Sequence, residues 1–151
     1  MLTKKAKYAL KAALHLARRG EGEAVLIADI AETERIPKKF LESILLTMKN
    51  RGILVSRKGR GGGYALARPA GEVSFGEIVR IMDGPLAPVA CVSVTAYRPC
   101  EECASEETCE VHGVMKRVRD AISEVLDATT LADALRDAAG HATRKPVRHH
   151  R

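Results

Sequence analysis

All four cysteines of this 151-residue chain lie within nineteen residues, at Cys91, Cys100, Cys103 and Cys109, and His112 follows closely. A cluster with such short gaps brings several thiolates within reach of one centre, which favours a metal site, an iron–sulfur cluster or a thiol switch. Two disulfides are the alternative, but disulfides persist mainly in secreted proteins, and the first residues contain no uninterrupted apolar run typical of a signal peptide. We therefore expect a cytoplasmic protein whose cysteines bind metal or undergo reversible thiol chemistry.

The composition is that of one compact unit with an aliphatic core. Hydrophobic residues make up 46% of the chain and charged residues 29%, but there are only two Phe, three Tyr and no Trp. Leu, Ile, Val and Ala must therefore fill the core. Because no apolar run approaches the roughly 18 to 20 residues that a membrane span requires, we expect no membrane partner.

Positive charge is concentrated in the first half of the chain. Residues 1–71 contain fifteen Lys and Arg against six Asp and Glu, whereas residues 72–151 contain ten against thirteen. A segregated basic surface is typical of proteins that bind a phosphate polymer, although a solvated face is an alternative explanation. The arrangement of the elements has to decide between the two.

Residues 3–50 have the pattern of a helix-turn-helix. Apolar residues recur every three or four positions over 3–19, a short second helix follows from Ile27, and Pro37 suits the first turn of a third helix. The third helix has a buried stripe and an outward side that is polar and basic. In helix-turn-helix proteins this helix enters the DNA major groove. Its candidate DNA contacts are Lys38, Lys39, Glu42 and Ser43.

Two short strands over 53–57 and 64–68 follow, joined by a glycine-rich loop. The loop lacks the Gly-Lys-Ser/Thr ending of a P-loop and leads into a strand instead of a helix, so a nucleotide-binding loop does not fit. A hairpin wing beside the recognition helix fits better. Arg57, Lys58 and Arg60 give it positive charge, and Arg60 at the tip is our candidate for insertion into the minor groove.

Beyond the wing, Ser74 and Glu77 have the spacing of a capping box at the start of a short helix. Residues 72–110 then form a linker helix and the cysteine loop. Apolar residues at a spacing of about 3.5 over 111–125 predict a long helix that pairs with a second copy, the alternative being a helix packed on its own domain. We expect dimerisation helices over 111–138. We expect a winged helix-turn-helix domain over 1–71 and a disordered basic tail over 139–151.

The glycine-rich stretch 59–64, ending in Tyr64, together with a cysteine loop ahead of a long helix, resembles the Rrf-type winged-helix transcriptional regulators, whose members include IscR, NsrR and CymR. The resemblance runs from Met1 to about Leu135. It implies a mainly α fold with a small β-hairpin wing, that is, a winged helix-turn-helix plus a long C-terminal dimerisation helix. By position Glu42 and Ser43 resemble the base-facing pair, while Lys58, Arg60 and Tyr64 resemble wing residues.

The same resemblance implies a function. The chain is expected to be a DNA-binding regulator and not an enzyme: a homodimer on a pseudo-palindromic operator of double-stranded DNA, acting as a repressor. In the cluster-binding members three cysteines of the loop hold an iron–sulfur cluster, and Cys91, Cys103, Cys109 and His112 match the family positions. Cys100 departs from that pattern, so either Cys100 or His112 is the expected fourth ligand. The cluster is 2Fe–2S or 4Fe–4S.

Several alternatives remain open for the cysteines. The spacing from Cys100 through Cys103 and Cys109 to His112 also satisfies the tetrahedral Cys₃His set of structural zinc, and a bare thiol switch needs no metal. The many glutamates of the loop argue against a low-pKa catalytic cysteine. An iron–sulfur electron carrier or an accessory subunit of an enzyme would leave the basic first half and the wing unexplained.

Overall fold

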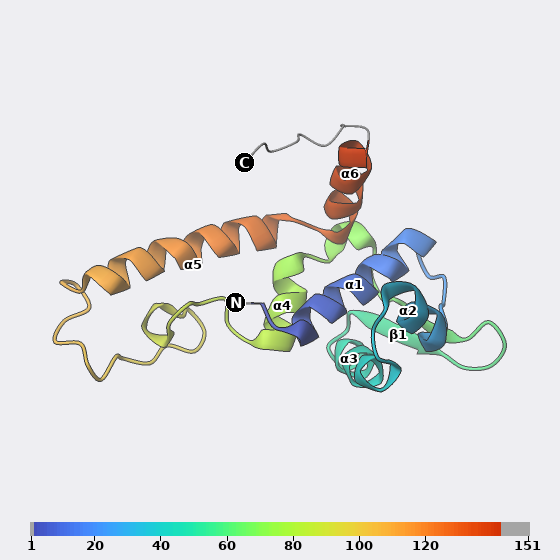
Figure 1. The fold of residues 1–151 in the computed structure, drawn as a ribbon, viewed down its shortest axis with the longest axis horizontal. Helices are drawn as coiled ribbons and strands as arrows, with labels where there is room; N and C mark the ends of the chain where they lie inside the picture. The colour runs from blue at the N-terminus through green and yellow to red at the C-terminus, as the bar shows by residue number, and fades with distance from the viewer. Residues whose placement is uncertain (1, 143–151) are drawn as a thin grey trace, which may run out of the picture.

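The computed structural model describes residues 2–142, in which a body of helices carries a hairpin at one end and a long helix extends from the other (Figure 1). The elements in chain order are α1 (Lys4–Arg19), α2 (Ile27–Glu34), α3 (Lys38–Asn50), β1 (Leu54–Arg57), β2 (Gly63–Leu66), the 3₁₀ turn η1 (Ala70–Glu72), α4 (Phe75–Asp83), the 3₁₀ turn η2 (Ala90–Val92), α5 (Glu110–Ala128) and α6 (Leu131–Ala142). The predicted mainly α fold with a hairpin wing is confirmed.

The core of the body lies between α1, α3 and α4. The Thr3 hydroxyl accepts a hydrogen bond from the Ala6 N–H at 3.1 Å and so caps the start of α1. Small alanines on the inner face of α1 let α3 and α4 approach closely. The large fully buried side chains of the described residues are aliphatic, as the composition predicts, except for Met48, and include Leu16, Leu41, Ile44 and Ile78.

The tight turn between α2 and α3 depends on two backbone positions. Arg35 adopts the left-handed conformation, with φ of 55°, and its N–H closes the end of α2. Pro37 lies just before α3 and not in its first turn as predicted, because its ψ of 123° is extended and the helix begins at Lys38. In either position its missing N–H costs nothing.

The hairpin is a two-stranded antiparallel sheet in which Leu54 pairs with Leu66 and Arg57 with Gly63. Both strands are shorter than predicted, since Ile53 and residues 67–68 lie outside them. The last glycine of the loop is required sterically, since a Cβ at Gly63 would lie 2.2 Å from the Val25 carbonyl oxygen. The backbone of Val25 also pairs with that of Tyr64, which anchors the base of the wing to the body.

The segment after the wing begins as predicted, with the Ser74 hydroxyl accepting from the Glu77 N–H at 3.1 Å. The predicted helices over 111–138 are two separate elements in the structure. The helical run breaks after Ala128, and α6 packs back against α1 with Leu131 fully buried. The first turns of α6 therefore lie against the body, whereas α5 extends away from it (Figure 1).

The helix α6 continues to Ala142, so residues 139–142 are helical and not part of a disordered tail as predicted. The rest of that predicted tail, 143–151, lies outside the described residues. Within the described part of the chain, no helix combines the length and apolar character needed to cross a membrane.

Candidate nucleic-acid interface and cysteine pocket

The outward side of α3 carries the predicted candidates for DNA contact. Lys38, Lys39, Glu42 and Ser43 are all exposed, opposite the stripe that packs into the core. The first turn contains these two lysines and no acidic residue, an arrangement that opposes the helix dipole and costs about 0.3–1 kcal/mol for each charge. A phosphate beside this turn would convert the cost into a gain.

The wing presents its positive charge to solvent. Arg57, Lys58 and Arg60 are exposed, and Arg60 lies at the tip between two glycines with positive φ. Tyr64 is different, because its side chain is half-buried against the core at the base of the hairpin. The four residues thus lie along one hairpin, but only the three charged ones are free to reach outward.

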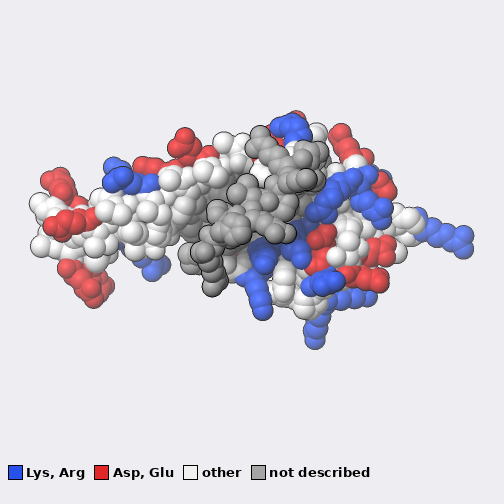
Figure 2. Space-filling view, turned by 45° about the horizontal axis from the view of Figure 1, so that its top comes forward, with Lys and Arg blue, Asp and Glu red and all other residues white. Residues whose placement is uncertain are grey.

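Charge is distributed unevenly over the molecule. Figure 2 shows Lys and Arg side chains projecting from the end that holds the helix-turn-helix and wing, with some acidic groups among them, while Asp and Glu gather at the opposite tip. The tip is the cysteine loop, which contains Glu101, Glu102, Glu106 and Glu107. A polyanion would therefore be attracted to the helix-turn-helix end and repelled by the cysteine end.

A buried ionic contact that the sequence analysis missed supports the helix-turn-helix. His15, only 6% exposed, has Nδ1 at 3.0 Å from Oε1 of Glu34 at the end of α2. Arg18 also donates to this carboxylate, at 3.1 Å. Burial alone would raise the pKa of Glu34, but the hydrogen bonds from His15 and Arg18 outweigh it and lower the pKa. No local sequence signal pairs these residues, because the contact joins two helices.

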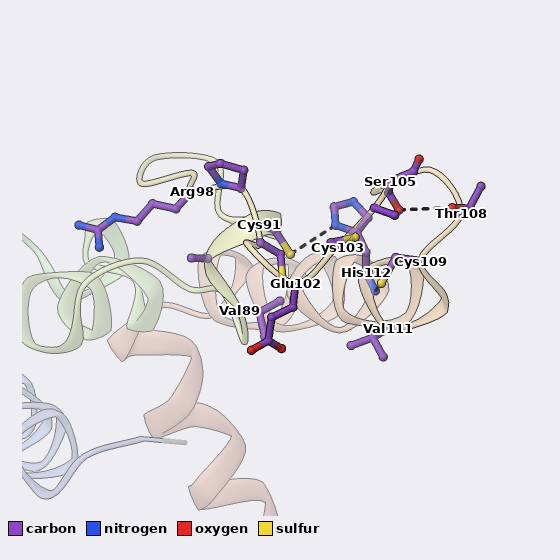
Figure 3. A pocket seen from close by; sticks show the side chains of 14 residues that line it. Val89, Cys91, Arg98, Glu102, Cys103, Ser105, Thr108, Cys109, Val111 and His112 are labelled. Atoms are coloured by element: carbon purple, nitrogen blue, oxygen red, sulfur yellow. Dashed lines mark hydrogen bonds between the residues drawn. The ribbon is translucent and has the colours of Figure 1, made fainter.

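The four cysteines and His112 line one pocket of about 540 Å³ at the start of α5 (Figure 3). Cys91 belongs to η2, Cys100 and Cys103 to the loop, and Cys109 is the cap residue of α5. The Cys109 sulfur accepts from the His112 N–H at 3.4 Å, which places the imidazole one turn into the helix. The structure thus brings all five predicted residues together.

Within the pocket, the imidazole of His112 contacts Cys91, with 3.4 Å between Nδ1 and Sγ. Cys91, Cys103 and Cys109 are half-buried, whereas Cys100 is exposed. Partial burial, together with a hydrogen bond from Cys103 to Cys109, raises the pKa of the Cys103 thiol. Figure 3 shows Arg98 extending away from the sulfurs, so the thiols lack an obvious cation, and a bound metal would supply one.

The donor set fits a metal cofactor, although it is not arranged around a single ion. Among residues 2–142, no three His, Cys, Asp or Glu side chains surround a point that a metal ion could occupy. Soft thiolates and an imidazole around an open pocket suit a cluster of several atoms better than one tetrahedral ion, which needs four donors about 2.0–2.3 Å from the same point.

One residue links this pocket to the long helix. Arg119 of α5 donates to the Val92 carbonyl oxygen, next to Cys91, at 2.6 Å. Val92 itself is 3% exposed. The turn η2 is therefore fixed to α5 at Arg119 and approaches it again at His112, seven residues earlier and on the same side of the helix. No local sequence pattern marks Arg119 as part of the site.

Known proteins resemble this chain over nearly its full length. Residues 2–137 match the model of the Rrf2 family, described as iron-dependent transcriptional regulators. A protein of Rhodobacter capsulatus, whose name places it among rrf2-like HTH-type transcriptional regulators, is 43% identical over 96% of this chain and 97% of its own. The HTH-type transcriptional regulator CymR of Bacillus subtilis is 34% identical over 87% of each chain.

Solved structures agree with these matches. CymR, described as the global cysteine regulator of B. subtilis, superposes with a TM-score of 0.73 at 30% identity, over 89% of this chain and 95% of its own. IscR of T. potens superposes with a TM-score of 0.75 at 26% identity, over 97% and 93%. From its sequence, its winged helix-turn-helix and these relatives, the chain belongs to the Rrf2 family of transcriptional regulators, and not to a family of enzymes.

Proposed function

We propose that this protein is a homodimeric DNA-binding repressor whose DNA affinity responds to an iron–sulfur cluster in the cysteine pocket. The observation that carries the proposal is the convergence of four cysteines and His112 on one pocket, in a chain that also carries a winged helix-turn-helix. The relatedness to IscR and the iron-dependent description of the family support it.

DNA would be bound through the basic end of the molecule. Lys38, Lys39 and Lys58 contact phosphates, Glu42 and Ser43 face base edges in the major groove, and Arg60 enters the minor groove. Tyr64 supports the wing from its base. Two symmetric copies read a pseudo-palindromic operator.

The second copy would pair with α5, none of whose residues is fully buried within one chain. One side of this helix carries an exposed apolar stripe of Val111, Val114, Val118, Ile122 and Val125. A stripe of this length on a helix that leaves the body is costly in water and suits an interface between two copies.

Cys91, Cys103 and Cys109 would hold the cluster, with His112 as the fourth ligand. His112 is favoured over Cys100 because it lies within 3.4 Å of Cys91, whereas Cys100 is exposed at the rim. A bound cluster would supply a redox-active, charged centre there. Arg119 would connect the cluster site to the dimer helix. It fixes η2 to α5, so a change in the order of the cysteine loop would reach α5.

Two alternatives use the same residues. Zinc would need Cys100, Cys103, Cys109 and His112 around one ion. A thiol switch without metal is favoured by the direct interaction of Cys103 with Cys109 and by the relatedness to CymR. Under either alternative the anaerobically purified protein would be colourless.

The test is anaerobic purification followed by an absorption spectrum and counts of iron, sulfide and zinc. Wild type should carry iron and sulfide, Cys103→Ser should lose the colour, and His112→Ala should shift the spectrum or make the cluster labile. Cys100→Ser is the matched control and should resemble wild type. Full colour in Cys103→Ser, or one zinc per chain without sulfide in wild type, would contradict the proposed site.

A further inference from the structure

Leu46 is an apolar side chain at the centre of the polar face of α3. Half of it is exposed, 50% by area, whereas the leucine just before it in the chain is fully buried. It follows Ser43 by three residues and Glu42 by four, so the three side chains share one side of the helix. The apolar periodicity of α3 accounts for the buried stripe and not for this residue.

Among the described residues, Leu46 is not one of the apolar side chains that pack against the hydrophobic core. Its neighbours three and four residues away, Glu42, Ser43, Lys49 and Asn50, are polar and exposed. The exposed apolar stripe of α5 extends from the other side of the body (Figure 1). Leucine is a good helix former, but Glu and Lys are equally good and suit water better, so helix formation does not require it here.

We propose that Leu46 is a specificity-determining residue that contacts the C5-methyl group of a thymine in the major groove. The inference rests on the proposed DNA-binding function of α3. The thymine methyl is the one apolar group that a base pair presents in that groove, and an aliphatic side chain recognises it by contact. Because one helical turn rises about 5.4 Å, the thymine lies about one or two base pairs from the base that faces Glu42.

The charges around Leu46 favour DNA over an apolar protein partner. Lys38 and Lys39 lie at one end of the exposed side of α3, and Lys49 lies at the other end. Cations at both ends can hold the helix against the phosphates on either side of a groove while its centre faces the bases. A protein partner that covered Leu46 would have to desolvate these lysines or pair them with acidic residues.

The experiment first selects a preferred duplex from a randomised library with the purified full-length protein. Each thymine of that duplex is then replaced by deoxyuridine, which lacks only the methyl group. At one symmetry-related pair of thymines, the replacement should lower the affinity of wild type about fourfold for each half-site. This factor corresponds to the loss of one buried methyl group. Leu46→Ala should bind the thymine and deoxyuridine duplexes equally well. Leu46→Met, which keeps an apolar contact, should retain discrimination.

Val94→Ala is the matched control, since Val94 is an exposed apolar side chain outside α3, at 80% exposure, and should behave as wild type. Circular dichroism should show all variants folded, because Leu46 contributes little to the core. If wild type binds the duplex but discriminates at no thymine, or if Leu46→Ala still discriminates, this inference is overturned while DNA binding stands. Selection of no duplex at all would overturn the proposed function and this inference together.

Discussion

Glu34 accepts hydrogen bonds from two residues of α1, and its side chain is only 11% exposed. Because an ionised carboxylate can only accept hydrogen bonds, Nδ1 of His15 carries the hydrogen in this contact. Since the pKa of Glu34 is lowered below the ordinary 4.5, the contact stabilises the fold fully above about pH 4.5, and this stability is lost as the pH falls through the lower folded pKa.

We therefore expect Glu34→Gln to reduce the free energy of unfolding by about 1.5–3 kcal/mol at pH 7, the range for charged hydrogen bonds, and by much less at pH 3. Urea unfolding at the two pH values measures this. Glu32→Gln, at an exposed position of the same helix, is the control and should change little. An equal loss for Glu34→Gln at both pH values would contradict the ionic role.

Single residues also show how far the sequence could predict the sites. The exposure of Lys38 and Arg60 was predictable, because apolar periodicity and glycine-rich turns are local signals. Tyr64 was also expected among the DNA contacts, and its backbone pairing with Val25, which holds it at the base of the wing, was not predictable because the two residues are distant in the chain. Leu46 was missed because it lies outside the periodic apolar positions that form the buried stripe of α3, and a single apolar residue predicts no contact by itself.

Among the elements, α4 and α5 meet at an ion pair. Arg80 donates two hydrogen bonds to Asp127, from Nη1 to Oδ1 at 2.5 Å and from Nη2 to Oδ2 at 2.8 Å. Hydrogen bonding to Asp127 raises the pKa of Arg80, and the same bond lowers that of Asp127. Gly76 leaves the room for it, since a Cβ there would lie within 3.0 Å of the Asp127 carboxyl carbon.

We predict that substitutions of Gly76 and Asp127 have non-additive effects on the free energy of unfolding. Gly76→Ala should disturb the ion pair in wild type, but in an Asp127→Ala background it should only remove a helical glycine, which stabilises by up to about 1 kcal/mol. The effect of Gly76→Ala on the free energy of unfolding should thus be more favourable in that background by about 0.5 kcal/mol or more. Purely additive values from urea unfolding would show that the glycine does not accommodate the pair.

The position of the break between α5 and α6 could not be predicted from the sequence. Apolar spacing continues from Val111 to Leu135 without a Gly or Pro near Thr129 and Thr130. The break arises from contacts distant in the chain: the Phe75 N–H donates to the Thr129 carbonyl oxygen and the Leu131 N–H to that of Val73, both at 2.9 Å. Local periodicity carries no information about such partners.

For the whole molecule, the exposed stripe of α5 predicts the oligomeric state. Val118→Asp combined with Ile122→Asp should convert a dimer into a monomer, because two carboxylates would be buried without partners at the interface. Analytical ultracentrifugation measures the mass. Lys116→Asp, on the opposite side of α5, is the control and should remain dimeric. A dimeric double variant would place the contact between copies elsewhere.

The cysteine loop lies at one end of the molecule and α3 lies in the body, away from that end (Figure 1), so the proposed regulation requires coupling through the elements between them. Contacts that can carry it run from η2 through Arg119 to α5, and from Asp127 through Arg80 to α4, which packs on α1 and α3. Such a contact chain becomes a coupling pathway only if occupancy of one end changes binding at the other.

The most direct test is the affinity of loaded and metal-free protein for the same selected duplex, at fixed salt and without oxygen. We expect the two forms to differ by about fivefold or more, the lower end of typical allosteric coupling, and Cys103→Ser to keep the metal-free affinity whatever the iron supply. Equal affinity of the loaded and metal-free forms would contradict control of DNA binding by the cysteine pocket.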